Sequence, residues 1–188
     1  MKIILIVVIL ILILIKSTFM KSNDKYNKAY TLGTFYLNSI DPDTIKKPAV
    51  MFDIDDTILM VNEKTGKLTI NKPMLKLLNE CIKRGYLIII ITARDSVYTK
   101  ETIEDLNHNS INYSYLYCRK NPKDNYELFK SDIKKYLLDT FGIHIVMSVG
   151  DNLIDIIGEY SGYGIKLPNK TNKKLYHINF NRQLEEVI

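Results

Sequence analysis

Hydrophobic and polar positions divide this chain into two unequal parts. An unbroken aliphatic run occupies residues 3–15 and is flanked by Lys2 and Lys16. From about residue 30 onward, short apolar runs alternate with longer stretches in which apolar residues recur every three or four positions. Short runs rich in β-branched residues are typical of buried strands, and the longer period is typical of helices that pack by one face. The pattern therefore predicts an apolar N-terminal segment followed by an α/β domain.

The predicted elements of the domain alternate along the chain. Strands are expected near residues 49–52, 86–91, 113–118, 144–149 and 164–167, and helices near residues 30–40, 72–84, 96–107 and 126–140, with a short helix after Asp151. This alternation predicts a parallel sheet with helices on both faces. Residues 57–71 have the pattern of a small β-hairpin flap. Residues 119–125, the other place at which a cap could be inserted, are too few for a cap domain, so we expect none.

The apolar start has the composition of a membrane segment. Extended through Phe19 and Met20, with Lys16 reaching toward the interface, it would form about 27 Å of helix, which approaches the thickness of a bilayer core. Residues 17–21 contain no convincing small-x-small cleavage pattern, so we expect an uncleaved anchor rather than a cleaved signal peptide. The predicted division is a membrane segment at residues 1–21, a stalk and helix at residues 22–48, and a globular domain at residues 49–188.

Composition changes this picture little. The net charge of +5 is mild and the basic residues are scattered, which indicates a solvated surface rather than a nucleic-acid groove. Two cysteines, Cys81 and Cys118, do not form a disulfide framework and are interpreted as buried thiols.

The candidate chemistry lies where the predicted strands end. Asp53 and Asp55 follow the first strand, Thr92 ends the second, and Asp151 and Asp155 follow the fourth. Ligands bind beyond the carboxyl ends of the strands in open parallel sheets, so these side chains are expected to meet. Each of them alone would be interpreted as a turn, a cap or a solvated side chain. Their joint order, each at a strand end, favours a site.

The aspartates predict a metal-dependent phosphoryl transfer. Carboxylates this close repel one another unless they hold a hard cation such as Mg²⁺, and a carboxylate beside such a cation can attack phosphorus. We assign Asp53 as the nucleophile and Asp55 as the acid/base that protonates the leaving oxygen and later activates water. Asp151 would complete the Mg²⁺ shell with Asp53 and the main-chain carbonyl of Asp55, and Asp155 would orient a metal-bound water.

The transferred phosphate also needs hydrogen-bond donors and a positive charge. Thr92 and the backbone N–H groups of Ala93 and Arg94 would hold the phosphate oxygens. Lys130 would neutralise the phosphate and the nucleophile, and Lys134, one helical turn later, is the competing candidate for this role.

These motifs resemble the haloacid dehalogenase superfamily of phosphohydrolases. FDIDDT at residues 52–57 resembles its motif I, the threonine of ITARD at residues 91–95 motif II, Lys130 motif III, and GDNLID at residues 150–155 motif IV. The stretch from residue 129 to residue 168 is similar to the acid phosphatase branch, subfamily IIIB. The resemblance covers about residues 47–169. It implies a Rossmann-like fold, with five parallel strands in the order 5-4-1-2-3, and Mg²⁺-dependent phosphomonoester hydrolysis.

The leading functional hypothesis is a membrane-tethered Mg²⁺ phosphatase acting on small phosphomonoesters or on phosphates displayed on a macromolecule. One alternative is a non-catalytic storage or scaffold protein on the same fold, which the presence of Asp53 disfavours. Another is an enzyme acting on phosphorylated nucleic-acid ends, which would need a basic groove, whereas Arg119, Lys120 and Lys123 are dispersed. Lysines after the apolar segment favour a cytoplasmic domain. The resembled branch is mostly exported, and we expect export.

Overall fold

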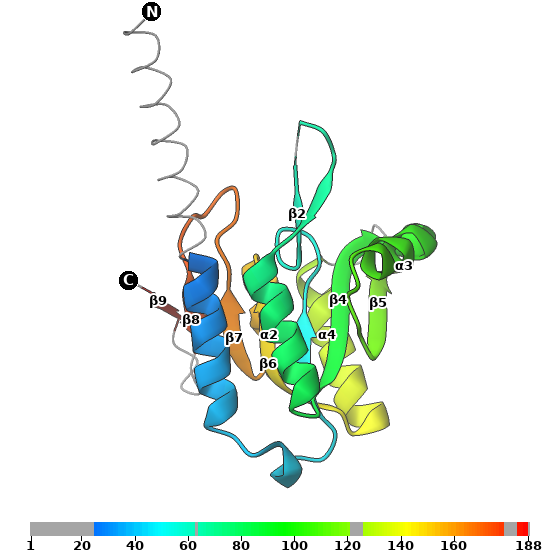
Figure 1. Cartoon of the computed structure of the whole chain (residues 1–188). Coiled ribbons are helices and arrows are strands. Elements are labelled where there is room, and N and C mark those ends of the chain that lie inside the picture. Colours follow the sequence, from blue (N-terminus) through cyan, green and yellow to red (C-terminus); the bar gives the residue numbers. More distant parts are fainter. Residues whose placement is uncertain (1–24, 63, 121–125, 179–183, 188) are drawn as a thin grey trace, which may run out of the picture.

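A computed structural model describes residues 25–62, 64–120, 126–178 and 184–187. The described strands form a seven-stranded sheet in the order β5-β4-β1-β6-β7-β8-β9 and a separate β2–β3 hairpin (Figure 1). The strands of the sheet are β1 (Pro48–Phe52), β4 (Leu87–Asp95), β5 (Tyr115–Arg119), β6 (His144–Gly150), β7 (Tyr163–Lys166), β8 (Tyr176–Ile178) and β9 (Leu184–Glu186). The helices are residues 25–38, α2 (Lys72–Lys83), α3 (Thr99–His108), α4 (Tyr126–Phe141) and α5 (Leu153–Ile156), with 3-10 turns η1 (Pro42–Thr44) and η2 (Ser96–Tyr98).

The sheet confirms the α/β prediction and corrects its order. The strands from β5 to β7 are parallel, and their relative order is the one expected for five strands. The observed sheet differs because β8 and β9 extend it by antiparallel pairing beyond β7. Both added strands are three residues long. A segment this short shows no usable hydrophobic period, which is why the sequence did not predict them.

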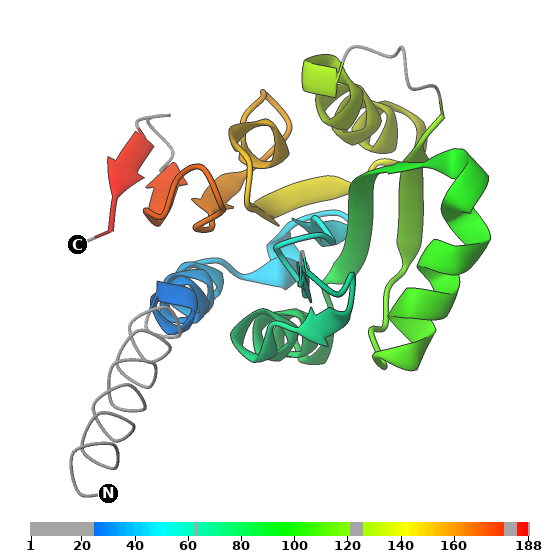
Figure 2. The same ribbon diagram turned by 90° about the horizontal axis from the view of Figure 1, so that it is seen from above.

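Alternation along the central strands creates a core on each face of the sheet. Successive side chains of a strand point to opposite faces. In β1, Val50 and Phe52 belong to the larger core cluster, whereas Ala49 and Met51 belong to the other. Figure 2 shows the consequence, with α4 on one side of the sheet and α2 and the helix at residues 25–38 on the opposite side.

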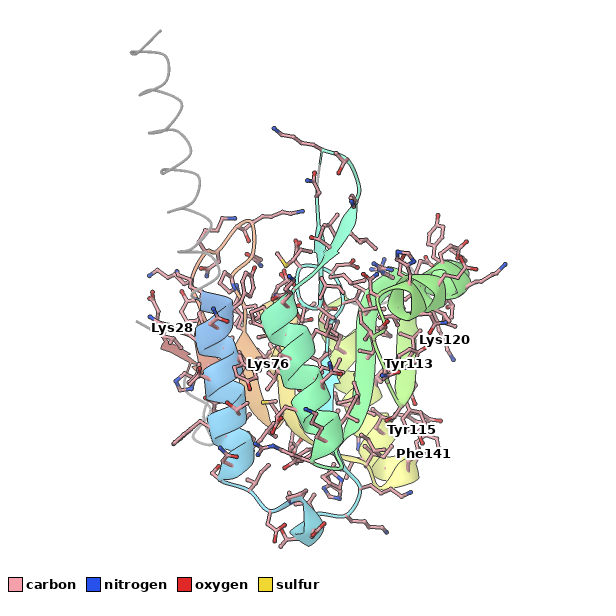
Figure 3. All side chains as sticks on the ribbon, in the orientation of Figure 1. Lys28, Lys76, Tyr113, Tyr115, Lys120 and Phe141 are labelled. Atoms are coloured by element: carbon pink, nitrogen blue, oxygen red, sulfur yellow. The ribbon has the colours of Figure 1, made fainter. Side chains whose placement is uncertain are left out.

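The helix at residues 25–38 is part of the folded core. Gly33 faces α2 so closely that a Cβ atom there would lie 2.8 Å from the tips of Leu77. Tyr36 stacks on Tyr163 of β7 with ring centroids 4.4 Å apart. Lys76 of α2, which is labelled in Figure 3, lies over the ring of Tyr30, 4.4 Å from its centroid. Although the sequence grouped this helix with a stalk, its contacts tie it to α2 and β7.

The predicted flap is confirmed, because β2 (Leu59–Val61) pairs antiparallel with β3 (Leu68–Ile70).

None of the described helices is both long and apolar enough to cross a membrane. The predicted anchor at residues 1–21 lies outside the described part of the chain, as do residues 121–125 of the other insertion point.

Candidate active site

The nucleophile candidate, Asp53, follows the last residue of β1 at the carboxyl edge of the sheet. Its backbone N–H donates to the carbonyl of Val149 in β6 at 3.0 Å, so the end of β1 is fixed against the neighbouring strand. The side chain is buried. Burial raises the pKa of Asp53 to about 7, and the charge of Lys130 opposes this rise.

Lys130 of α4 joins two of the predicted aspartates. Its Nζ lies 2.6 Å from Oδ1 of Asp53 and 2.6 Å from Oδ1 of Asp155. Burial alone would lower the pKa of Lys130, but Asp155 and Asp53 together raise it above the usual lysine value, so the ammonium stays charged. The structure thus places Lys130 beside Asp53.

Lys134 is also buried, but its partners are different. Its Nζ donates to the backbone carbonyl of Asp155 at 2.5 Å and to Oγ of Ser161 at 2.8 Å. Burial lowers its pKa to about 7. Lys134 therefore contacts a main-chain carbonyl and a serine hydroxyl, whereas Lys130 contacts the two carboxylates.

Three of the four predicted metal-ligand residues come together. One carboxylate oxygen from each of Asp53, Asp151 and Asp155 lies within 4.8 Å of the others. Burial raises the pKa of Asp151 to about 6, and the nearby charges of Asp155 and Asp56 add to this rise. The crowded oxygen atoms and the excess of carboxylates over the ammonium of Lys130 fit a hard divalent cation such as Mg²⁺. Asp55 is predicted to contribute its main-chain carbonyl, and this grouping of side-chain carboxylates among the described residues does not include it.

Gly150 makes the close approach of Asp155 possible. It ends β6, and a Cβ atom at this position would lie 2.2 Å from Cβ of Asp155. Asp155 lies in the short helix α5, and its Oδ2 accepts from the backbone N–H of Asn152 at 2.8 Å. The absence of a side chain at residue 150 therefore lets α5 fold back over the strand end.

The predicted phosphate-binding residues lie at the end of β4, and Arg94 is used in an unexpected way. Oγ1 of Thr92 accepts from the backbone N–H of Arg94 at 3.2 Å. The N–H of Arg94, which was predicted to hold phosphate, therefore already has an acceptor. The Arg94 side chain binds Asp55 through two hydrogen bonds of 2.8 and 2.7 Å. Ala93, the other predicted backbone donor, lies between Thr92 and Arg94 on β4. Sequence reasoning assigned Arg94 only by its backbone and missed this contact.

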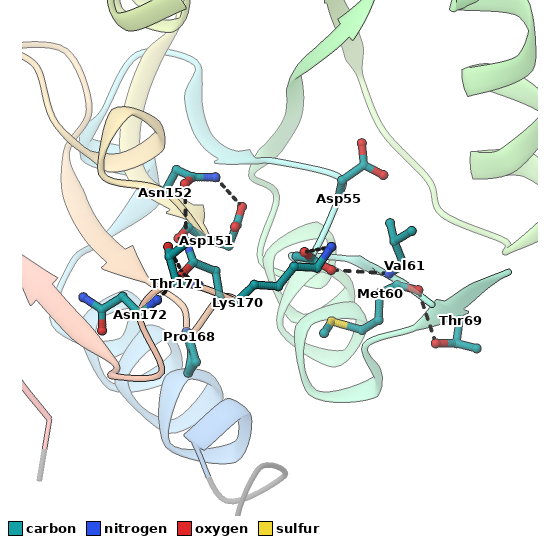
Figure 4. Close-up of polar contacts among 12 residues, drawn as sticks. Asp55, Met60, Val61, Thr69, Asp151, Asn152, Pro168, Lys170, Thr171 and Asn172 are labelled. Atoms are coloured by element: carbon teal, nitrogen blue, oxygen red, sulfur yellow. Dashed lines mark hydrogen bonds and ion pairs between the residues drawn. The ribbon is translucent and has the colours of Figure 1, made fainter. Parts of the chain in front are cut away.

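Asn169 is a second residue that sequence reasoning did not identify. Its Nδ2 donates to the backbone carbonyl of Asp151 at 2.8 Å and to Oδ1 of Asn152 at 3.3 Å. The adjacent Lys170 extends toward the flap and lies 3.6 Å from Oδ2 of Asp56 (Figure 4). The loop after β7 is thus attached both to the acidic group and to the base of the flap. An asparagine in a polar loop gives no sequence signal for such a role.

The family model described as HAD superfamily, subfamily IIIB (acid phosphatase) matches residues 60–175. The matched range includes Thr92, Lys130, Asp151 and Asp155 and begins after Asp53. A comparison with curated protein sequences finds no match.

Solved structures of low sequence identity share the fold. The class C acid phosphatase from Bacillus anthracis matches with a TM-score of 0.57 and 21% identity, covering 73% of this chain and 66% of that chain. With tungstate bound, it matches with a TM-score of 0.55 and 20% identity over the same shares. A chain of the Pnkp1/Rnl/Hen1 RNA repair complex gives a TM-score of 0.49 and 20% identity, covering 58% of this chain and 38% of that chain. The last likeness is too low to carry an argument about function.

Proposed function

The chain belongs to subfamily IIIB of the HAD superfamily, the acid phosphatases, and on this premise we propose that it hydrolyses phosphomonoesters through an aspartyl-phosphate on Asp53. The observation that carries the proposal is the meeting of Asp53, Asp151 and Asp155 with Lys130 at one edge of the sheet. These side chains come from β1, α4 and the segment after β6, so only the folded chain unites them.

The proposed reaction has two displacements at phosphorus. A carboxylate oxygen of Asp53 bonds to phosphorus while the ester P–O bond breaks, and Asp55 supplies a proton to the leaving oxygen. Water then attacks the phosphorylated Asp53, which releases inorganic phosphate. Lys130 holds Asp53 and offsets the negative charge that gathers around it. Asp53, Asp151 and Asp155 would hold Mg²⁺, which supplies further positive charge when bound.

A direct assay tests this function. The full-length protein is expected to hydrolyse p-nitrophenyl phosphate with added Mg²⁺ and to lose this activity in excess chelator. Asp53→Asn keeps the shape of the side chain but removes the attacking charge, so it should abolish turnover. Full activity in that variant would refute the mechanism. No turnover of any phosphomonoester by the unaltered protein would favour the storage or scaffold alternative.

We also propose that residues 1–21 tether the domain to a membrane, because residues 3–15 are an unbroken aliphatic run. The full-length protein should then stay with membranes after an alkaline carbonate wash. Release into the supernatant would contradict the tether. Asn112-Tyr113-Ser114 and Asn169-Lys170-Thr171 match the glycosylation pattern, so a glycan on either in a eukaryotic host would support export.

A further inference from the structure

Arg94 lies at an irregularity in β4. The strand pairs with β5 up to Thr92 and Cys118, and the next pair is Asp95 and Arg119. Ala93 and Arg94 therefore have no counterpart on β5 at this point. A bulge of this kind changes the direction of the side chains it carries. Here it accompanies the contact between the Arg94 guanidinium and the loop that follows β1.

The guanidinium of Arg94 engages both carboxylate oxygens of Asp55. Its Nε donates to Oδ2 at 2.8 Å and its Nη2 to Oδ1 at 2.7 Å. Its Nη1 donates to Oδ2 of Asp105 in α3 at 2.7 Å. The Arg94 side chain is 18% exposed and that of Asp55 is 40% exposed. Arg94 is thus largely enclosed, while Asp55 retains a surface that a reactant can reach.

The planar fork of an arginine restricts a carboxylate more than a lysine does. Two parallel charge-assisted hydrogen bonds fix both the position and the plane of the carboxylate. The bond to Asp105 in turn restrains the guanidinium from α3. Through Arg94, α3 therefore helps to hold Asp55 in place, in addition to the loop that carries Asp55.

We propose that Arg94 is a positioning residue for the second displacement, in which it holds Asp55 in the orientation that accepts a proton from the attacking water. The inference deepens the function proposed above and depends on it. The water oxygen bonds to phosphorus, the bond from phosphorus to the Asp53 oxygen breaks, and the water proton passes to Asp55. The products are inorganic phosphate and the free Asp53 carboxylate. Asp105 keeps its bond to Arg94 throughout, so the guanidinium stays in place.

The two displacements can be separated kinetically with p-nitrophenyl phosphate. Its leaving group departs without much protonation, so the first displacement depends little on Asp55. The parameter kcat/KM reports this first displacement, whereas kcat includes the second. Arg94→Gln cannot form the pair of parallel hydrogen bonds to Asp55. We therefore expect kcat to fall by about tenfold to a hundredfold, within what a general base contributes. KM should fall by the same factor, leaving kcat/KM unchanged, and phosphorylated protein should accumulate.

Arg84→Gln is a matched control far from the aspartates. Arg84 also binds two side chains, Glu80 at 2.9 Å and Asn38 at 2.7 Å, but these lie in α2 and at the end of the helix at residues 25–38. Its kinetics should equal those of the unaltered protein. Arg94→Lys should recover only part of kcat, because an ammonium cannot hold both Asp55 oxygens and Asp105 in one geometry.

Asp105→Asn is a second variant that tests the proposal if Arg94→Gln does not fold. It removes the charge that restrains Arg94 and leaves the fork on Asp55, so kcat should fall less than in Arg94→Gln, again at constant kcat/KM. An equal fall of kcat and kcat/KM, without phosphorylated protein, would overturn the proposal and assign Arg94 to phosphate binding or to folding. An unchanged kcat in Arg94→Gln would overturn it as well. If the unaltered protein shows no turnover, the proposed function fails, and this result is distinct from either outcome.

Discussion

Two buried lysines in this site have different partners, and we expect them to differ in function. Lys130 contacts the carboxylates of Asp53 and Asp155, whereas Lys134 contacts a backbone carbonyl and Ser161. Removing a preorganised charge from a phosphoryl-transfer site costs roughly 10²–10³-fold in kcat. We expect a loss of this size for Lys130→Met and a smaller loss for Lys134→Met, because methionine fills a similar volume. Steady-state rates with p-nitrophenyl phosphate measure both. Equal losses, or the reverse order, would show that Lys134 is the residue that acts on the phosphate.

The sequence identified the site residues better than it identified their contacts. Asp53, Asp151 and Asp155 could be predicted to meet because each follows a parallel strand, and strand ends share one edge. The choice between Lys130 and Lys134 could not be made, since residues one turn apart lie on the same helical face. The side-chain role of Arg94 was missed because it accompanies a bulge, and no sequence period marks a bulge.

At the scale of elements, the end of β6 and α5 are in close contact at Gly150. A Cβ atom at residue 150 would overlap Asp155, so Gly150→Ala should displace α5 and the carboxylate it carries. We expect at least a tenfold higher Mg²⁺ concentration for half-maximal activity, as is found when groups that orient a metal ligand are removed. Gly66→Ala is a suitable control, because no atom of the described residues lies within 4 Å of its added Cβ. It should cost about 1–2 kcal/mol of stability through its positive φ without changing the Mg²⁺ requirement. The same Mg²⁺ requirement in Gly150→Ala and the unaltered protein would contradict this account.

The flap is the other element that affects function. Between β1 and α2, the regular structure of the described residues is the β2–β3 hairpin alone. A hairpin cannot enclose a small substrate as a cap domain does, so selectivity for the leaving group should be weak. Kinetics across a panel of phosphomonoesters test this expectation. A preference above a hundredfold for one small metabolite, about 2.7 kcal/mol of selective transition-state binding, would contradict it.

At the scale of the whole molecule, the buried aspartates link stability to pH. Burial raises the pKa of Asp53 to about 7 and that of Asp151 to about 6, from 3.8. Between about pH 4 and pH 7 the folded protein holds protons that the unfolded chain releases, so the stability of the metal-free protein should fall as pH rises. Lys134 acts in the opposite sense above about pH 7, because its pKa is lowered from 10.5.

Thermal unfolding with chelator or Mg²⁺ measures this linkage. Mg²⁺ needs ionised carboxylates, so it should raise Tm more at about pH 8 than at about pH 5. In a chain of this size, each kcal/mol corresponds to about 2–4 °C in Tm. Asp53→Asn removes one titrating group and should flatten the decline in the metal-free protein. A metal-free Tm that rises between about pH 4 and pH 7 would contradict the burial of these carboxyls as protonated groups.

The packing of the helix at residues 25–38 against α2 and β7 has a consequence for how the chain is made. Tyr26 and Pro168, which are joined by a 3.4 Å hydrogen bond, are 142 positions apart. At ribosomal rates of about 5–20 residues per second, that interval takes roughly 7–30 s. The helix therefore leaves the ribosome long before Tyr163, which stacks on Tyr36, and Ile165, which lies beside Gly33, have been synthesised. Its apolar face stays uncovered on that side until then. Closure of the domain is then a late event in synthesis, because the helix at residues 25–38 packs against a strand made much later.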